Sequence, residues 1–298
     1  MNTRLRAYAD LLRLHFFFAW PLLFCSGFLL AATRYGTFTG PDIVRVALIG
    51  FFGFEAGFVL NDYIDREYDK NDVECDRLTR YWRIFGTRPL PAGLIPPGQA
   101  LALFAVLSAL TAVLIATLPF PNSFFVLVIM AASYGLEVFY QVRKRSQNSP
   151  LAQLAGRLDF ALFPVAGYLC MGFPDLLALS YFLFFYPFAE AHLGANDIID
   201  IKNDRARGMK TVTTLYGMKG SISWIAGFLV IHGFAALLFM TMLGWIARAG
   251  IVSGLLLLLC AAVILIRRTD PATGMKVLPF FHIAMLLYAG SIVLDSVL

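Results

Sequence analysis

Long apolar runs separated by short polar segments dominate this chain of 298 residues. Nine of the runs have the length that a helix needs to cross a bilayer, about 20 largely apolar residues. The predicted spans cover residues 14–32, 42–60, 99–118, 121–140, 151–173, 176–195, 221–243, 251–267 and 277–297. Prolines stand at or near several of the predicted turns, where helices are expected to stop. The pattern therefore predicts an all-α membrane protein with a bundle of nine transmembrane helices.

Composition agrees with this prediction, because 59% of the residues are hydrophobic and only 14% are charged. A soluble domain averages about 25% charged residues. No linker or low-complexity stretch divides residues 1–298, so a single domain is predicted. The first run contains Pro21 and lacks a small-residue cleavage site, which favours a first span over a cleavable signal. The four cysteines (Cys25, Cys75, Cys170 and Cys260) have no metal-ligand spacing and are predicted to be reduced thiols.

The basic residues divide unevenly between the two predicted sides of the membrane. With the N-terminus inside, the inside segments collect 20 of the 24 Lys and Arg residues. The outside loops hold only Arg34 and Arg248, and Arg45 and Arg157 fall within spans. The positive-inside rule then predicts a protein of the cell membrane with a cytoplasmic N-terminus. The net charge of +5 reflects this topology and requires no nucleic-acid partner.

One polar motif, Asn-Asp-x-Ile-Asp-x-x-x-Asp, ends two of the apolar runs, at residues 61–69 and 196–204. The three acids of each copy are spaced i, i+3 and i+7, which places them on one face of a helix. Six carboxylates on two facing helix ends repel each other unless cations lie among them. Mg²⁺ takes carboxylate and phosphate oxygens together. The motifs therefore predict a site for a metal-bound, phosphate-bearing substrate at the cytoplasmic surface of the membrane.

A basic loop that contains glycine follows each acidic motif. The first loop has Arg77, Arg80 and Arg83 before Gly86-Thr-Arg88-Pro-Leu-Pro-Ala-Gly93, and the second has Arg205, Arg207, Gly208, Lys210 and Thr211. Bases that pair with phosphate oxygens beside acids that hold Mg²⁺ make a diphosphate site. Charge runs at span ends are usually solvated segments that set topology, but two near-identical copies on one side favour a functional site.

These motifs resemble the signatures of the UbiA superfamily of intramembrane prenyltransferases. Residues 61–69 with the later Arg88-Pro-Leu-Pro-x-Gly93 are similar to the first signature, and residues 200–211 are similar to the second. Tyr140-x-x-x-Lys144-Arg145 resembles the element that follows the fourth span of the family. The resemblance implies a nine-helix bundle whose central cavity is capped by cytoplasmic loops. It also implies Mg²⁺-dependent transfer of an isoprenoid from its diphosphate to a lipophilic acceptor, with release of diphosphate.

The resemblance further implies roles for individual residues. The catalytic and metal-ligating residues would be Asp62, Asp65, Asp69, Asp197, Asp200 and Asp204. The substrate-binding residues would be Asn61, Arg77, Arg88, Tyr140, Lys144, Asn196 and Lys210, with Arg80, Arg83 and Arg145 as weaker candidates. Two or more Mg²⁺ ions are expected, and Mn²⁺ is expected to substitute for them.

The sequence leaves the acceptor, the donor chain length and the oligomeric state open. The candidate acceptors are an aromatic quinone or chlorin precursor and a glycerol-lipid phosphate, and a cyclase without an acceptor is a further alternative. An ion-coupled transporter is the alternative from another class, because internal repeats and intramembrane acids are typical of transporters. The position of the acids at the membrane edge and the odd number of spans disfavour it.

Seven other ionisable residues fall in or near the spans: Arg45, Glu55, Glu137, Arg157, Asp159, Glu190 and His192. Such groups cost free energy in the membrane unless they are paired or wet, so they are expected to face the bundle interior. They are consistent with an acceptor pocket, with a proton path, or with ordinary buried pairs. Some of the 28 Phe residues are expected to line the isoprenoid cavity.

Overall fold

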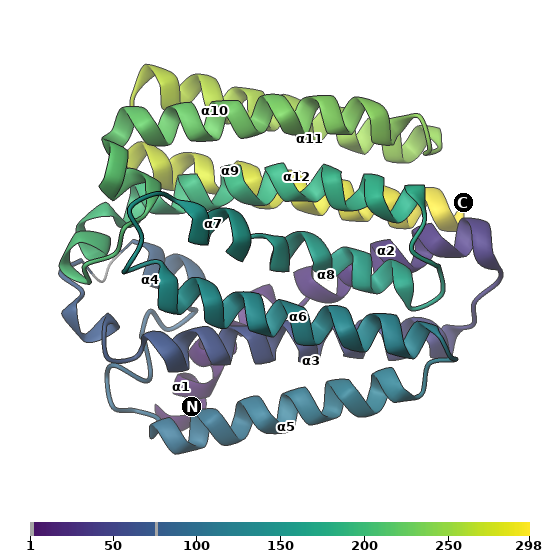
Figure 1. Ribbon diagram of the computed structural model, residues 1–298, viewed down its shortest axis with the longest axis horizontal. Coiled ribbons are helices and arrows are strands. Elements are labelled where there is room, and N and C mark those ends of the chain that lie inside the picture. The colour runs from purple at the N-terminus through teal and green to yellow at the C-terminus, as the bar shows by residue number, and fades with distance from the viewer. Residues whose placement is uncertain (1–2, 75–76) are drawn as a thin grey trace.

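The computed structural model describes residues 3–74 and 77–298 and consists of helices joined by turns and loops (Figure 1). The long helices are α2 (Ala19–Tyr35), α3 (Gly40–Asp65), α5 (Pro97–Ala116), α6 (Asn122–Arg143), α9 (Leu176–Ala206), α10 (Val212–Met240), α11 (Trp245–Arg267) and α12 (Pro271–Val297). The short ones are α1 (Thr3–Leu11), η1 (Leu14–Phe16), η2 (Asp69–Asn71), α4 (Leu78–Trp82), α7 (Leu151–Gly156) and α8 (Leu158–Leu169). No strand occurs in the two described ranges. Cys75 lies outside them, so the prediction of its thiol state is not addressed.

Within this part of the chain, eight helices are long and apolar enough to cross a membrane, with η1 and α2 forming the first. The protein is therefore a multi-pass membrane protein, as predicted. The predicted span 151–173 differs from the others, because α7 ends at Gly156 and α8 begins at Leu158. Arg157, at the break, has φ −74° and ψ −4°, which departs from a continuous helix, and Pro164 lies inside α8. Nine continuous helices are therefore not confirmed.

Side-chain caps fix where several helices begin. Asp175 precedes α9 and accepts a hydrogen bond from the backbone N–H of Ala178 at 2.8 Å. Asp270 caps α12 in the same way through Thr273 N–H at 2.8 Å. Thr39 and Asp42 form a capping box at the start of α3. Each cap satisfies backbone donors that have no partner within the helix, so these residues define the helix starts.

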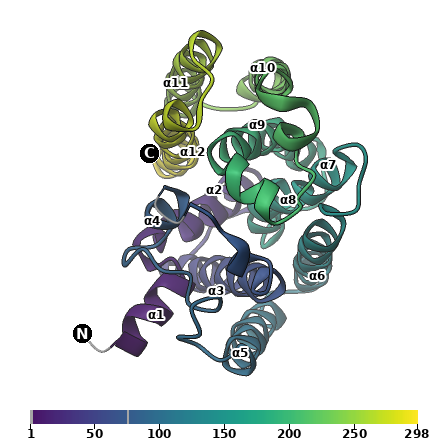
Figure 2. The ribbon, with the colours of Figure 1, turned by 90° about the vertical axis from the view of Figure 1, so that its left-hand side faces the viewer.

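The end view shows α5 on one side of the bundle and α10 and α11 on the opposite side (Figure 2). In the rest of the bundle α2 contacts α3, α8 and α12, while α8 also contacts α6 and α9. The outer helices α5, α10 and α11 pack mainly on α3, α9 and α12 respectively. Most residues of the outer helices are not buried, as expected of surfaces that face lipid.

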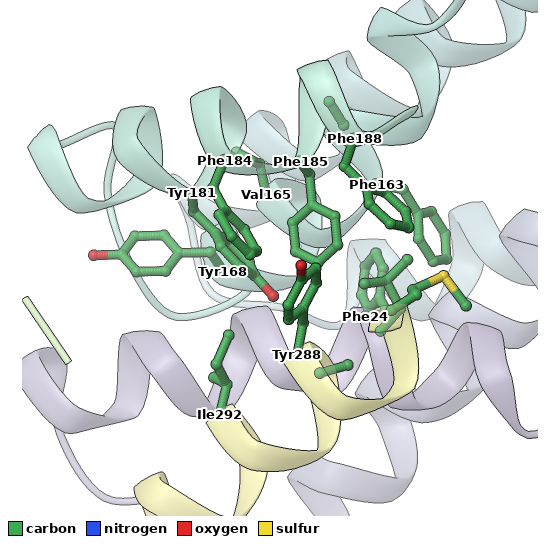
Figure 3. Packing of buried hydrophobic residues seen from close by; sticks show 14 of the residues in the cluster. Phe24, Phe163, Val165, Tyr168, Tyr181, Phe184, Phe185, Phe188, Tyr288 and Ile292 are labelled. Carbon is green, nitrogen blue, oxygen red and sulfur yellow. The ribbon is translucent and has the colours of Figure 1, made fainter. Parts of the chain in front are cut away.

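Aromatic side chains fill the bundle between α2, α8, α9 and α12 (Figure 3). Phe184, Phe185 and Tyr288 are fully buried there. The phenol of Tyr181 lies 2.6 Å from Ser26 Oγ, so this buried hydroxyl keeps a hydrogen-bond partner. The paired phenylalanines at 184–185 are thus core residues, whereas Phe17 and Phe18 are 57% and 47% exposed.

Two glycines allow α2 and α8 to cross in direct backbone contact. A Cβ at Gly27 would lie 2.0 Å from the carbonyl oxygen of Pro164, and a Cβ at Gly167 would lie 2.0 Å from that of Phe24. Neither carbonyl is the end of a flexible side chain, so the two helices would have to separate. Small residues that permit such close approach are typical of helix crossings in membranes.

Gly167→Ala is therefore expected to lower the thermal unfolding temperature in detergent, whereas Gly135→Ala is not. Gly135 lies in α6 and has no atom within 4 Å of a Cβ built on it. Alanine there gains up to about 1 kcal/mol of helix propensity, while overpacking at Gly167 costs about 1–3 kcal/mol. Intrinsic fluorescence during heating measures both variants. Equal unfolding temperatures for the two would contradict the crossing described here.

Candidate active site

The two acidic motifs meet across one cavity at the end of the bundle where α3 and α9 finish (left in Figure 1). The cavity has a volume of about 300 Å³. Asp62 and Asp65 of α3 line it, as do Asp197, Asp200 and Asp204 of α9. The second copy of the motif therefore presents its acids from one helix, as predicted. In the first copy α3 ends at Asp65, so Asp69 follows in η2 and the single-helix prediction is wrong for that residue.

Basic side chains from several distant segments neutralise the acids of the first motif. Asp62 pairs with Arg13 at 3.1 Å and with Arg83 at 2.6 Å. Asp65 pairs with Lys144 at 2.6 Å and with Arg145 at 2.5 Å. All these side chains are largely buried, and buried charges persist where partners compensate them.

Neutral donors instead hold two of the acids of the second motif. Asp197 accepts a hydrogen bond from Gln153 Nε2 at 2.6 Å, and Asp204 accepts one from Thr211 Oγ1 at 3.1 Å. Asp200 accepts one from Asn203 Nδ2 at 2.7 Å and lies 3.3 Å from Arg207. The α9 side of the cavity therefore carries less compensating positive charge than the α3 side.

The cap is formed by the segments that follow the two motifs, residues 66–74, 77–96 and 207–211, and Arg88 and Arg207 connect it to the acids. Arg88 lies 2.6 Å from Asp69 and 3.3 Å from Asp72, and Arg207 also contacts both acids. Burial alone would lower the pKa of Arg88, but the neighbouring carboxylates of Asp69 and Asp72 raise this pKa above its usual value. Burial raises the pKa of Asp72 despite its two guanidinium partners. The cap is therefore held on the site by a compact charged network.

The cavity continues from the charged residues into an apolar part. Trp20 of α2 stacks on Phe54 of α3, with ring centroids 3.9 Å apart and planes within 9°. Phe58 packs edge-on against both rings. Met130 and Phe163 also line this part. A molecule in the cavity would have a charged region at one end and aromatic faces at the other.

A further group of polar side chains also lines the cavity. Asn61 Nδ2 donates to Glu137 Oε1 at 2.6 Å. Arg157, at the break between α7 and α8, lies 3.5 Å from both Glu137 and Asp159. The ionisable residues Glu137, Arg157 and Asp159 therefore form one cluster on the cavity lining.

Comparison with known proteins connects this geometry to a family. Residues 18–286 match the model of the UbiA prenyltransferase family. This chain belongs to that family. As a UbiA-family protein it is a prenyltransferase, which confirms the enzyme class that the resemblance implied and disfavours the transporter alternative.

Three relatives illustrate the range of the UbiA family. The chain is 28% identical to digeranylgeranylglyceryl phosphate synthase of Halobacterium salinarum over 227 residues, 74% of each chain. It is 29% identical to 4-hydroxybenzoate octaprenyltransferase of Citrobacter koseri over 198 residues, 65% of this chain and 61% of that relative. A UbiA homolog of Archaeoglobus fulgidus, solved bound to DMAPP and Mg²⁺, superposes with a TM-score of 0.70 at 18% identity, covering 98% of this chain and all of that one. The fold is thus that of solved UbiA homologs.

The structure brings most of the predicted site residues of this UbiA-family protein together. The cavity-lining set includes Asn61, Arg88, Tyr140, Lys144 and Asn196 besides five of the six acids. Asp69 is not part of the lining, but it lies 2.6 Å from Arg88, which is. Arg77 and Lys210 do not line the cavity: Arg77 lies 3.8 Å from Glu74, and Lys210 Nζ lies 3.5 Å from Asn148 Oδ1.

Several residues of the site are not distinguished by any pattern in the sequence. Arg207 contacts three acids. It lies in the basic loop after the second motif, but nothing in the sequence distinguishes it from the other basic residues of that loop. Arg13 stands at the start of the first span, where a basic residue is also expected for topology alone. Gln153 has no charge or motif that would distinguish it in the sequence. Contacts between distant segments give these residues their positions, and no local pattern carries that information.

The remaining intramembrane ionisable residues differ in their surroundings. Arg45 pairs with Asp42 at 2.6 Å, away from the cavity lining. The carboxylates of Glu55 and Glu190 are buried, and the polar side chain of Tyr186 lies in the surroundings of Glu190. His192 lines the cavity.

Proposed function

We propose that this protein transfers an isoprenoid chain from its diphosphate to a lipophilic acceptor, inside the membrane and with release of diphosphate. The observation that carries the proposal is the meeting of both acidic motifs across a cavity that is charged at one end and aromatic at the other. The Archaeoglobus fulgidus homolog, bound to DMAPP and Mg²⁺, supports a prenyl diphosphate as donor. The relatives support either an aromatic ring or a glycerol-lipid phosphate as acceptor.

The donor set fits a hard divalent cation. Carboxylates from α3 and α9 line the same cavity, and such all-oxygen sets suit Mg²⁺ or Mn²⁺. Among the described residues no three acid, His or Cys side chains gather closely enough to hold an ion alone, so phosphate oxygens would complete the coordination. We assign this role to Asp62, Asp65, Asp69, Asp197, Asp200 and Asp204, with two or more ions. When bound, Mg²⁺ supplies Lewis-acid stabilisation of the departing diphosphate.

The protein's own groups would perform the remaining tasks. Lys144 lines the charged end and would donate to the diphosphate oxygens once it leaves Asp65, whereas Arg145 pairs with Asp65 from outside the lining. Arg88 closes the cap over the same region. The faces of Trp20, Phe54 and Phe58 flank the isoprenoid, exclude water and stabilise positive charge that develops at C1.

We further propose nine crossings of the membrane, with α7 and α8 together making the fifth. The two short helices follow one another along the bundle (Figure 1). Asp10 of α1 accepts hydrogen bonds from Phe85 and Thr87 N–H, which places α1 beside the cap, whereas the C-terminus lies at the opposite end of the bundle. An odd number of crossings separates the termini in this way. The excess of basic residues at the cap end supports a cytoplasmic cap and N-terminus in the cell membrane.

The direct test uses the full chain, purified and placed in lipid nanodiscs with Mg²⁺ and radiolabelled geranylgeranyl diphosphate. The two acceptors to offer are 4-hydroxybenzoate and geranylgeranylglyceryl phosphate. The expected result is diphosphate release that depends on one of the acceptors, with a prenylated product. Donor hydrolysis without transfer to either acceptor, or a cyclised product, would contradict the proposed reaction.

Lys144→Ala is expected to raise KM for the donor more than KM for the acceptor. Loss of a charge-assisted hydrogen bond to a phosphate oxygen weakens donor binding by about 10- to 100-fold. Arg145 still neutralises Asp65 in this variant, which limits damage to the fold. Lys202, an exposed lysine that pairs with Glu74, provides the control Lys202→Ala. Equal effects on the KM of both substrates would argue that Lys144 only shapes the cap.

The proposed orientation predicts which cysteines a membrane-impermeant thiol reagent reaches in sealed inside-out vesicles. Single cysteines at positions 71, 205 and 248 suit this test in a background that lacks the four native ones, because Asn71, Arg205 and Arg248 are exposed. The first two are expected to react and the third to be protected. Labelling of position 248 without position 71 would show that the orientation is opposite to the one proposed. Labelling of position 71 without position 205 would show that the two motifs lie on different sides of the membrane.

A further inference from the structure

A chain of hydrogen bonds outside the acidic motifs connects the cavity to the cap. It begins at His192 of α9, which lines the cavity. His192 Nε2 lies 3.1 Å from Nε2 of His282 in α12, and His282 Nδ1 lies 2.5 Å from the hydroxyl of Tyr81 in α4. The Tyr81 side chain is half-buried, so the chain leads from the cavity to the edge of the cap.

Aromatic rings hold these three side chains in place. Tyr81 stacks on His282 at 5.4 Å, and Trp82 packs edge-on against the same imidazole at 5.0 Å. On the other side Phe188 lies parallel to His192, with centroids 6.3 Å apart. His15 Nε2 lies 2.9 Å from the backbone oxygen of Tyr81, which ties α4 to the start of the first span. The two imidazoles and the phenol are therefore in fixed relative positions.

The electrostatic surroundings favour proton passage over proton storage. The titratable and charged groups that act on His192 are His282 from α12 and Arg157 from the junction of α7 and α8. Within the described ranges neither imidazole forms an ion pair with a carboxylate. An imidazolium beside a guanidinium in a low-dielectric site is unfavourable, so His192 can accept a proton at one nitrogen only while it gives up the proton on the other. Burial raises the pKa of Tyr81 to about 12, which keeps its hydroxyl protonated and able to donate.

We propose that His192 is the general base that removes the proton from the acceptor, and that His282 and Tyr81 are positioning residues that carry this proton to the cap. This inference rests on the proposed prenyl transfer. Whether the acceptor nucleophile is an aromatic carbon or a hydroxyl oxygen, its new bond to C1 of the isoprenoid replaces one bond to hydrogen. The C1–O bond breaks, its electron pair leaves with the diphosphate, and one proton must leave the acceptor.

Each step of this proton transfer follows one of the observed hydrogen bonds or starts at a free ring nitrogen. His192 Nδ1 makes no hydrogen bond within the described part of the chain, so it is available to a molecule in the cavity. When Nδ1 takes the proton, Nε2 of His192 passes its own to Nε2 of His282. His282 Nδ1 then passes its proton to the Tyr81 hydroxyl, which releases one at the cap. Asn196 Nδ2 donates to the backbone oxygen of His192 at 3.0 Å and also lies 3.3 Å from His192 Nε2. In the tautomer that this path requires Nε2 carries the proton, so this second contact joins two donors and is not a hydrogen bond.

The chain contains a matched pair for comparison. His232 lies 2.8 Å from the backbone oxygen of Phe184 and 3.0 Å from the hydroxyl of Tyr288. Both side chains are fully buried, and neither lines the cavity. His232 and Tyr288 thus resemble His282 and Tyr81 in chemistry, but they have no connection to the reacting molecules.

The test compares His192→Ala and Tyr81→Phe with His232→Gln and Tyr288→Phe. It uses the full chain in nanodiscs with Mg²⁺, geranylgeranyl diphosphate and the acceptor that the wild type prenylates. His192→Ala is expected to lower kcat at least about 100-fold, the usual minimum for loss of a general base, with an unchanged KM for the donor. Added imidazole is expected to restore part of the rate. Tyr81→Phe keeps the ring packing, and it is expected to lower kcat and to alter its pH profile.

Three results would overturn the inference. One is a wild-type kcat and pH profile in His192→Ala. Another is a loss in His192→Ala that imidazole does not restore while Tyr81→Phe retains wild-type kinetics, which would assign His192 a packing role. The last is an equal loss in the His232 and Tyr288 controls at unchanged thermal stability. Failure of the wild type to form any prenylated product would instead contradict the proposed function, and the inference with it.

Discussion

Asp200→Asn is expected to reduce turnover by at least about 100-fold, the usual cost of removing one preorganised electrostatic contact to the reacting groups. Asp200 lines the cavity and has one cationic partner, Arg207 at 3.3 Å, whereas Asp62 and Asp65 have two each. The substitution keeps the shape of the side chain, and its amide oxygen still accepts from Asn203. Arg207 keeps Asp69 and Asp72 as partners, so no buried cation loses all of its partners.

Asp270→Asn is the matched control, because Asn also caps a helix and Asp270 lies outside the cavity lining. Diphosphate release by purified protein measures both variants, with thermal unfolding as a check on folding. Asp65 is a less suitable target, because its loss would leave Lys144 and Arg145 without their shared carboxylate. If Asp200→Asn keeps more than a small fraction of wild-type turnover, the assignment of this acid to the metal is wrong.

The long apolar runs predicted where most of the long helices lie, but they did not predict where these helices end. The spans near 42–60 and 176–195 correspond to α3 and α9, but both helices continue into the polar motif. Hydropathy marks where a helix leaves apolar surroundings and not where it ends. The break at Arg157 was not predicted. Arg157 pairs with Asp159 of α8 and with Glu137 of α6, and a contact with a different helix cannot be read from the local sequence.

The candidate site was predicted from its repeated acids more completely than from its bases. The acids at i and i+3 of the first motif and all three acids of the second share a helix, so their common face follows from the sequence, whereas Asp69 lies beyond the end of α3. The bases lie in loops, where spacing does not determine direction: Lys210 lies outside the cavity lining, while Arg207 from the same loop lies inside. Asn203 accepts from the backbone N–H groups of Val73 and Glu74, so the second motif also fixes the loop that follows the first. Such reciprocal contacts between distant segments leave no local pattern.

The second large effect is expected on removal of divalent cations, which should abolish turnover and also weaken donor binding. In the structure Lys144 and Arg145 are engaged with Asp65, and Arg88 is engaged with Asp69. If these basic side chains instead pair with a diphosphate, the carboxylates that they leave remain buried without a positive partner, which costs substantial free energy. A divalent cation that takes over the carboxylates removes that cost. Donor and metal should therefore bind cooperatively, and each should raise the affinity of the other by the same factor.

The measurement is isothermal titration of geranyl thiodiphosphate, a slowly reacting donor analogue, into the nanodisc protein with Mg²⁺ and after exhaustive chelation. Chelation is expected to weaken binding by about tenfold or more, within the usual range of coupling between two sites. In Lys144→Ala the coupling should shrink, because one of the cations that must change partners is gone. Mn²⁺ should restore both binding and turnover, since the ligands are all oxygen. Full activity after chelation, or donor affinity that is independent of the metal, would show that the acids serve only to hold the basic residues in place.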